Sequence, residues 1–395
     1  MDTEPKSYGF TRRDFMKSSA GLLAAGGAAT WPGTAALSQE KGTGQQSSSA
    51  TTKVIIDTDP GVDDALALLL AMRSPELKIL GITAVAGNVP LEFTLPNALR
   101  MVEIAGRKDI PVASGAKGPL VRRLVTAAYA HGENGLGGAV FPEPKLKPIS
   151  DPAAQFICDT VRKHADDITL VTLGPLTNVA AALNSDKQLA KMVSRLVMMG
   201  GSLSGGNITP AAEFNVYVDP EAARIVFQSG IAITMVGLDV TRKTSLTDEH
   251  VRILESAQNP VSQAAGKIAR NAIDHNRQQG FLVGPNMHDS LAVASVIDAS
   301  ILKWQDYYVD VETTGELTAG ETLGYSPEAG DLKRRPGFQR ATNMAIRGSA
   351  PTLAATKTSP VIRDQFVPNT KVAVDVDSAR FFDLLIGRLS GQRPA

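Results

Sequence analysis

The chain has 395 residues, of which 43% are hydrophobic and 20% are charged, so it is long enough to bury one large core or two ordinary ones. Its 40 basic and 40 acidic side chains balance, which leaves no electrostatic footprint for nucleic acid or an anionic membrane. The single cysteine, Cys158, excludes a disulfide within the chain, and we expect it to be a small buried apolar residue.

The N-terminal segment is typical of an export signal. Residues 11–39 read TRRDFMKSSAGLLAAGGAATWPGTAALSQ, in which an arginine pair precedes an apolar run too short and too glycine-rich to span a bilayer stably. This pattern resembles a twin-arginine signal peptide, with small residues at Ala35 and Ala36 for cleavage. We therefore predict a signal over residues 1–38, a flexible linker over 39–52, and export by the twin-arginine machinery to the periplasm or the medium.

From residue 53 onward, short β-branched runs alternate with helical segments. The predicted strands are Val54–Ile56, Leu77–Val85, Ile168–Leu173, Arg195–Met199, Ile231–Val236, Tyr307–Glu312 and Val372–Val376. The predicted helices are Ala65–Met72, Leu91–Ile104, Asp151–His164, Leu176–Ser185, Pro220–Gln228, Ser262–Gln278, Ser290–Ile297 and Ser378–Leu389. The alternation predicts one α/β domain over residues 53–395, with an open, mostly parallel, Rossmann-like sheet flanked by helices. Residues 324–369 lack a clear apolar period, and we predict that they form a surface insertion.

Polar motifs follow the predicted strands. DTDPGVDD comes after the first strand, AGN after the second, LGPLTN after the third, and MMGGSLSGGN after the fourth, with AEFN a little further on; MHDS precedes a late helix. In open parallel sheets, ligands bind outside the carboxyl ends of the strands. We therefore expect these polar residues to gather at one edge of the sheet, as an active site requires.

The first motif concentrates negative charge, because Asp57, Asp59, Asp63 and Asp64 fall within eight positions. Carboxylates this close are costly unless a cation neutralises them, and a hard divalent ion with oxygen ligands does so. The Pro60-Gly61 pair forces a tight turn that lets the acids on either side of it face one point. The motif therefore predicts a metal site.

Two other families with acidic loops were weighed against this motif. An EF-hand loop counted from Asp57 fails, because Gly61 and Leu68 stand at positions where that loop needs an acid and a glutamate. A haloacid-dehalogenase-type phosphatase also has a strand followed by D-x-D, but it does not require the following Pro-Gly-Val-Asp-Asp. It stays a distant alternative that a phosphate-ester assay would settle.

Together, the motifs resemble those of the nucleoside hydrolases, the inosine-uridine preferring family. The matching stretches are DTDPGVDD, AGN at Ala86–Asn88, LGPLTN at Leu173–Asn178, MGG at Met199–Gly201, AEFN at Ala212–Asn215 and HD at His288–Asp289, in the family's order and near its spacings. The match covers most of residues 53–324 and resumes at VAVDVDSARFFDLL, so only the export signal and the 324–369 insertion depart from it. The resemblance implies an enzyme that hydrolyses ribonucleosides to ribose and free base with Ca²⁺ and that forms a homo-oligomer. Together with the predicted export signal, it implies a salvage enzyme that acts outside the cytoplasm.

The resemblance also implies a role for each motif residue. The Ca²⁺ ligands would be Asp59, Asp64, Asp289 and the backbone carbonyl of Leu173, and Asp59 would be the general base. Ribose would be held by Asp63, Asn88, Asn207, Glu213 and Asn215, with Met199 under the sugar. His131 would contact the base, Phe214 would line the pocket or pack beneath it, and His288 would donate a proton to the leaving base. Asp57 would be a structural hydrogen-bond acceptor behind the loop.

Two questions stay open at the level of sequence. Departure of a purine base is assisted by protonation of its ring, whereas departure of uracil needs less or different assistance. One sequence therefore does not establish a purine or pyrimidine preference. A non-catalytic nucleoside- or sugar-binding protein on the same scaffold is the alternative function. The presence of Asp59, Asp64 and Asp289 argues against it.

Overall fold

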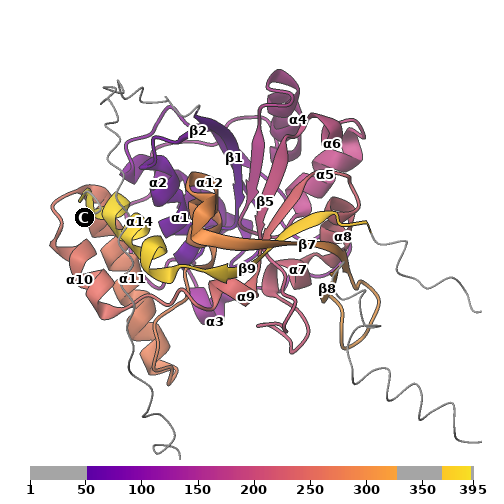
Figure 1. Ribbon diagram of the computed structural model, residues 1–395. Coiled ribbons are helices and arrows are strands. Elements are labelled where there is room, and N and C mark those ends of the chain that lie inside the picture. The colour runs from indigo at the N-terminus through magenta and orange to yellow at the C-terminus, as the bar shows by residue number, and fades with distance from the viewer. Residues whose placement is uncertain (1–50, 327–366, 393–395) are drawn as a thin grey trace, which may run out of the picture. The chain divides into compact units, whose positions relative to one another are not determined.

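In the computed structural model, the described residues are 51–326 and 367–392. Within them, nine strands form one sheet in the order β3-β2-β1-β4-β5-β6-β9-β7-β8 (Figure 1). The strands are β1 (Thr52–Thr58), β2 (Leu77–Ala84), β3 (Val112–Ser114), β4 (Thr169–Thr172), β5 (Arg195–Met199), β6 (Ile233–Val236), β7 (Leu302–Val311), β8 (Thr322–Tyr325) and β9 (Thr370–Val376). Pairs from β3 to β9 are parallel, whereas β7 pairs antiparallel with β9 and with β8. The predicted fold class, an open and mostly parallel sheet, is confirmed.

The strands are apolar on both faces because helices cover the sheet on both sides. Successive side chains point to opposite faces, so Val54 and Ile56 of β1 enter one core cluster and Ile55 enters the other. Helices α1, α2, α10, α11, α12 and α14 contribute to the first cluster, and α4, α5, α6 and α8 to the second (Figure 1). Cys158 lies buried in the second cluster, as predicted.

The helices of the described ranges have the following bounds: α1 (Val62–Met72), α2 (Leu91–Ile104), α3 (Ala128–His131), α4 (Ala153–Lys163), α5 (Thr177–Ser185), α6 (Leu189–Met192), α7 (Phe214–Val218), α8 (Pro220–Phe227), α9 (Leu238–Thr241), α10 (Asp248–Ser256), α11 (Pro260–Gln278), α12 (His288–Ile297) and α14 (Ser378–Ser390). Every predicted helix is present. None of the helices in these ranges combines the length and the apolarity needed to cross a bilayer.

Helix α1 is buried along its whole length, and this explains its sequence. It contacts β2, α2, α11, α12 and α14, so a helix that is apolar all round is stable there. Its N-cap is Gly61, whose amide donates to the Asp64 carboxylate at 3.0 Å. The helix therefore presents its acidic first turn, Asp63 and Asp64, at the carboxyl end of β1.

The structure also adds to and corrects the predicted elements. The strands β3 and β8 and the helices α3, α6, α7, α9 and α10 were not predicted. The boundaries of the predicted 324–369 insertion need correction, because Gly324 and Tyr325 belong to β8 and Asn369 hydrogen-bonds to Tyr307 and Val309 of β7. The interior of that insertion, the predicted signal and nearly all of the predicted linker lie outside the described residues.

Candidate active site

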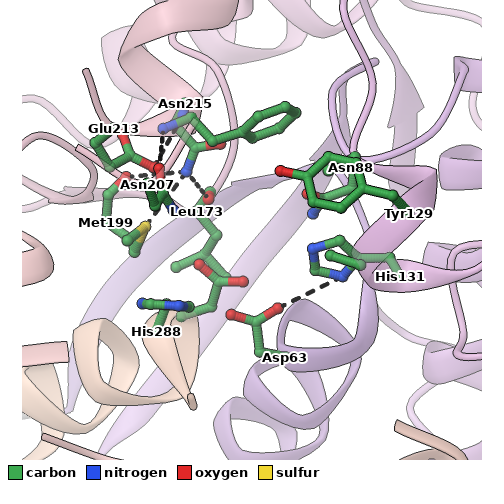
Figure 2. Close-up of a pocket in the computed structure, with 14 residues that line it drawn as sticks. Asp63, Asn88, Tyr129, His131, Leu173, Met199, Asn207, Glu213, Asn215 and His288 are labelled. Carbon is green, nitrogen blue, oxygen red and sulfur yellow. Dashed lines mark hydrogen bonds and ion pairs between the residues drawn. The ribbon is translucent and has the colours of Figure 1, made fainter. Parts of the chain in front are cut away.

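One cavity collects almost all of the predicted site residues (Figure 2). The residues that line it are Asp63, Asn88, Ala127, Tyr129, Ala130, His131, Leu173, Met199, Asn207, Glu213, Phe214, Asn215, His288 and Asp289. They come from the carboxyl ends of β4 and β5, the loops that follow β2 and β5, the starts of α1, α7 and α12, and the segment that contains α3. The expected gathering of polar residues at one sheet edge is therefore observed.

Three buried carboxylates lie close enough to share one cation. Asp63, Asp64 and Asp289 each offer an oxygen, and these atoms lie within 4.8 Å of one another. Burial raises the pKa of Asp289 well above its usual range, and the negative charges of Asp63, Asp64 and Asp59 raise it further. Such a cluster is unfavourable by itself and fits a hard divalent cation, which prefers oxygen ligands.

The backbone holds Asp64 rigidly in this cluster. Its carboxylate accepts hydrogen bonds from Thr58 Oγ1 at 2.6 Å, from the Asp59 amide at 3.2 Å, and from Asn88 Nδ2 at 2.9 Å, in addition to the Gly61 amide. These donors stabilise the charged form, whereas burial raises the pKa of Asp64. The side chain of Asp64 is therefore fixed before any ligand arrives.

Asp59 lies beside the cluster, between two glycines. Its Oδ2 accepts from the Asn88 amide at 2.7 Å, while its buried Oδ1 has no hydrogen-bond partner among the described residues. A Cβ built on Gly87 would lie 2.0 Å from Asp59 Oδ2, and one on Gly174 would lie 2.4 Å from Oδ1, so neither position admits a side chain. Burial, together with the charge of Asp64, raises the Asp59 pKa well above its usual range.

The predicted metal ligands thus have different surroundings in the structure. Asp64 and Asp289 belong to the close group, which contains Asp63 in addition, and Asp59 is not a member of it. The Leu173 carbonyl lines the cavity and accepts from Asn215 Nδ2 at 2.7 Å. Among the described residues, three buried side-chain oxygens at this edge have no hydrogen-bond partner, namely Asp59 Oδ1, Asp57 Oδ2 and Thr172 Oγ1, and of these the Asp59 oxygen belongs to a predicted metal ligand.

Asp57 lies behind the loop, as expected of a structural acceptor. Its Oδ1 accepts from Thr83 Oγ1 and, at 2.7 Å, from Asn178 Nδ2, and burial raises its pKa to about 7. Asn178 also donates to the Ala84 carbonyl and accepts from the Ala116 amide. The asparagine that ends LGPLTN therefore ties the end of β1 to the end of β2.

The start of α7 forms the opposite wall. Glu213 caps the helix, accepting from the Asn215 amide at 2.9 Å and the Val216 amide at 3.1 Å, and it also accepts from the Gly201 amide at 2.9 Å. Burial raises the Glu213 pKa to about 7 despite these donors. Asn215 Nδ2 lies 3.3 Å from the Met199 carbonyl and 3.4 Å from its sulfur, so β4, β5 and α7 are joined at this wall (Figure 2).

Two further predicted residues flank α7. Asn207 Oδ1 accepts from the Phe214 amide at 2.9 Å, which orients the Asn207 side chain at the cavity. Phe214 is buried, and it packs against Ala127 and Val218 while it also lines the cavity. Phe214 therefore lies at the cavity wall, and its role toward a substrate stays a prediction.

The two histidines occupy different parts of the cavity. His131 Nδ1 accepts from the Val62 amide at 3.1 Å, at the N-terminus of α1, and lies 3.9 Å from Asp63 Oδ1 (Figure 2). His288 opens α12, and its Nδ1 lies 2.7 Å from Thr241 Oγ1. Burial lowers the pKa of His288, while the charge of Asp63 raises it.

Sequence reasoning missed Tyr129, which lines the cavity while 60% of its surface is exposed. Its carbonyl lies 2.7 Å from His275 Nε2, so α3 is attached to α11. The available signal was an aromatic residue two positions before His131 in a glycine-rich loop.

Comparisons with known proteins agree with this geometry. The model of the inosine-uridine preferring nucleoside hydrolase family matches residues 54–383. The chain is 41% identical to the pyrimidine-specific ribonucleoside hydrolase RihA of Salmonella gallinarum over 338 residues, which are 85% of this chain and 97% of the relative. Among solved structures, the purine-preferring ribonucleoside hydrolase from Gardnerella vaginalis has a TM-score of 0.73 and 30% identity, and the plant nucleoside hydrolase PpNRh1 has 0.71 and 32%. Each alignment covers 86% of this chain and 99% of the other. The chain therefore belongs to the inosine-uridine preferring nucleoside hydrolase family and is an N-glycosyl hydrolase.

Proposed function

We propose that this enzyme hydrolyses the N-glycosidic bond of ribonucleosides to ribose and free base, and that it requires Ca²⁺. The observation that carries the proposal is the set of buried carboxylates Asp63, Asp64 and Asp289, beside an Asp59 oxygen that has no partner among the described residues. Oxygen-only ligands suit calcium. Asp59, Asp64, Asp289 and the Leu173 carbonyl would hold the ion, with Asp63 next to it. When bound, the ion would lower the pKa of a water molecule and grip the ribose diol.

Asp59 is the proposed general base. The oxygen of the attacking water bonds to C1′ of the ribose, and Asp59 accepts the proton that this water releases. The C1′–N bond breaks, and its electron pair leaves with the base. His288 lines the same cavity and supplies a proton to that base, so charge and atoms balance.

The sugar would lie against the wall formed by α7. Asp63 and Asn88 would bind the ribose hydroxyls near the carboxylates, while Asn207, Glu213 and Asn215 would hold the far hydroxyls, with Met199 beneath the ring. All six residues line the cavity. Hydrogen bonds to backbone groups fix Asn207, Glu213 and Asn215 in advance, so these side chains lose little entropy when the sugar binds.

The base would lie near His131 and Phe214. The relative at 41% identity is described as pyrimidine-specific, and we propose pyrimidine ribonucleosides as the preferred substrates. The test is release of reducing sugar from uridine, cytidine, inosine, adenosine and 2′-deoxyuridine, with and without EDTA. We expect turnover of uridine that EDTA abolishes and Ca²⁺ restores, and much less turnover without the 2′-hydroxyl. No turnover of any nucleoside by enzyme supplied with Ca²⁺ would refute the proposed function.

The alternative is a non-catalytic nucleoside- or sugar-binding protein. Asp59→Asn distinguishes the two, because an enzyme should lose turnover while it still binds nucleoside, and a binding protein has no turnover to lose. The family membership and the complete set of carboxylates favour the enzyme.

We also propose export by the twin-arginine route and a homo-oligomer in the periplasm or the medium. The arginine pair Arg12-Arg13 before the apolar run supports the route. Replacing both arginines with lysine should leave the protein in the cytoplasmic fraction. Normal export of that variant would refute the route, and a monomeric mass by light scattering would refute the oligomer.

A further inference from the structure

Thr241 lies at the end of α9, a short helix that follows β6, and the sequence patterns gave no role to it. Its side chain is fully buried, and its Oγ1 lies 2.7 Å from Nδ1 of His288. His288 comes from a distant part of the chain, the first residue of α12, and it lines the cavity. A buried hydroxyl from one element therefore contacts the rear nitrogen of a histidine that faces the reacting groups.

The position of Thr241 is fixed by backbone hydrogen bonds. Its amide donates to the Gly237 carbonyl at 3.1 Å, and its own carbonyl accepts from Thr244 Oγ1 at 2.7 Å. The amide of Leu238, the first residue of α9, donates to the carbonyl of Gly201, in the loop that follows β5. A β-branched side chain has few rotamers in a helix, so Oγ1 has little freedom to leave the imidazole.

The contact decides which nitrogen of His288 faces the cavity. Imidazole has two nitrogens, and the hydrogen bond made by one of them fixes the ring orientation and the role of the other. With Nδ1 bonded to Thr241, Nε2 is left for the substrate. A hydroxyl both donates and accepts, so Oγ1 can keep its bond to Nδ1 whether or not that nitrogen carries a proton.

We propose that Thr241 is a positioning residue for the leaving-group step, holding the His288 ring so that Nε2 points at the departing base. The inference rests on the proposed function, because it assumes that His288 gives a proton to the base. In that step the proton moves from Nε2 to the base nitrogen that receives the electron pair of the broken C1′–N bond. Thr241 touches neither the substrate nor the reacting atoms.

The first test compares Thr241→Val, which removes the hydroxyl at nearly constant volume, with Thr241→Ser, which keeps it. The matched control is Thr370→Val, because Thr370 is likewise buried, lies outside the cavity, and its hydroxyl bonds Asn369 rather than any residue around His288. We expect Thr241→Val to lower kcat for uridine by about 10- to 100-fold with KM changed less than about threefold, since a general acid contributes roughly 10²–10⁴-fold. Thr241→Ser and Thr370→Val should stay within about threefold of wild type.

The second test uses a substrate whose leaving group needs no proton. 4-Nitrophenyl β-D-ribofuranoside releases a phenolate that is stable at neutral pH, so Thr241→Val should hydrolyse it at nearly the wild-type rate. In a His288→Ala background, Thr241→Val should add no further loss with uridine. Equal losses with both substrates, or a further loss without His288, would show a structural role and overturn the proposal.

A third measurement does not depend on turnover. Long-range ¹H–¹⁵N NMR spectra report which ring nitrogen of His288 carries the proton. Thr241→Val should change that pattern, and the control Thr370→Val should not. An unchanged pattern in Thr241→Val would overturn the positioning role even if activity fell. If wild-type enzyme turns over neither substrate, the proposed function fails instead, and the spectra still test the contact.

Discussion

The cavity has two parts that are built differently. The floor consists of Asp63, Glu213 and Asn215, which line the cavity, with Asp59 and Asp64 fully buried behind them; all five lie at strand ends or helix starts. The rim consists of Ala127, Tyr129, Ala130 and His131, which come from one short segment around α3. The floor is joined to three strands by hydrogen bonds, whereas Tyr129 of the rim is mostly exposed.

This difference separates chemistry from selectivity. Catalytic groups need positions fixed within fractions of an ångström, and strand ends and helix N-termini provide such positions. Nucleobases differ in size, and a surface segment can change its sequence to fit a different nucleobase without disturbing the sheet. Changes in the floor should therefore reduce turnover of every nucleoside, and changes in the rim should alter which nucleoside is preferred.

The largest effect is expected from Asp59→Asn. The variant loses the proposed base and a cation contact, so kcat should fall by roughly 10³-fold or more for every nucleoside. Nucleoside binding measured by calorimetry should persist, because the ribose contacts remain. Asp109→Asn, an acid outside the cavity that pairs with Arg107, is the control and should keep full activity. If kcat fell only a few-fold, Asp59 would not be the general base.

Gly87→Ala should come next, because it changes the floor without removing a polar group. The new methyl would lie 2.0 Å from Asp59 Oδ2, so the carboxylate must move, and we expect kcat to fall about 100-fold, since small displacements of this kind cost that much. Gly118→Ala is the matched control, because its Cβ would meet only Leu124 at 3.8 Å. Wild-type turnover by a folded Gly87→Ala enzyme would show that the placement of Asp59 is not critical.

Because buried acids have raised pKa values, the free energy of unfolding of the metal-free protein should fall as pH rises. Burial raises the pKa of Glu213 from its ordinary value of 4.5 to about 7, so between these values the folded protein binds more protons than the unfolded chain. The free energy of unfolding in EDTA should therefore fall as pH rises from about 4.5 to 7, by on the order of 3 kcal/mol for this group. Asp57, with a pKa of about 7, adds to the same slope.

Urea unfolding at pH 5 and pH 7.5 in EDTA measures this slope. Glu213→Gln should make it shallower, because the titrating group is gone. Added Ca²⁺ should stabilise the protein more at pH 7.5 than at pH 5, since it binds the deprotonated carboxylates. A stability that rises with pH in EDTA would contradict the assigned direction of these pKa shifts.

The smallest effects should come from the rim. His131→Ala should lower kcat/KM by about tenfold and change the ratio between uridine and inosine, because the side chain is proposed to contact the base rather than the sugar. Tyr129→Ala should raise KM about three- to tenfold, as loss of one stacking contact does. If both variants lost the same factor in kcat/KM for purine and pyrimidine nucleosides, the rim would not determine selectivity.

The floor could be predicted from the sequence because each of its residues follows a strong local pattern. A strand followed by DTDPGVDD places its acids at the end of that strand, and the Glu of AEFN precedes a short helix. Both positions can be predicted from a few neighbouring residues. The elements that escaped prediction depend on contacts distant in sequence. Strand β3 has only three residues, and β8 is fixed by pairing with β7 and by hydrogen bonds between Thr322 and Ser202.

The rim and the support of His288 were missed for the same reason. Tyr129 lies in a four-residue helix whose place depends on the bond between its carbonyl and His275. Thr241 gives no signal as a single threonine, and only the folded chain brings it to His288. The sequence predicted that the acids around Pro60-Gly61 face one point, but which of them lie nearest to Asp289 depends on how the first turn of α1 faces α12.

The central claim is that the buried carboxylates hold one divalent cation without which no nucleoside is split. Elemental analysis of the pure enzyme, combined with turnover of uridine before and after EDTA treatment, tests it most directly. We expect one Ca²⁺ per chain, loss of both the ion and the activity in EDTA, and no ion in the Asp64→Asn/Asp289→Asn double variant. Full turnover by enzyme that contains no divalent ion would contradict the claim.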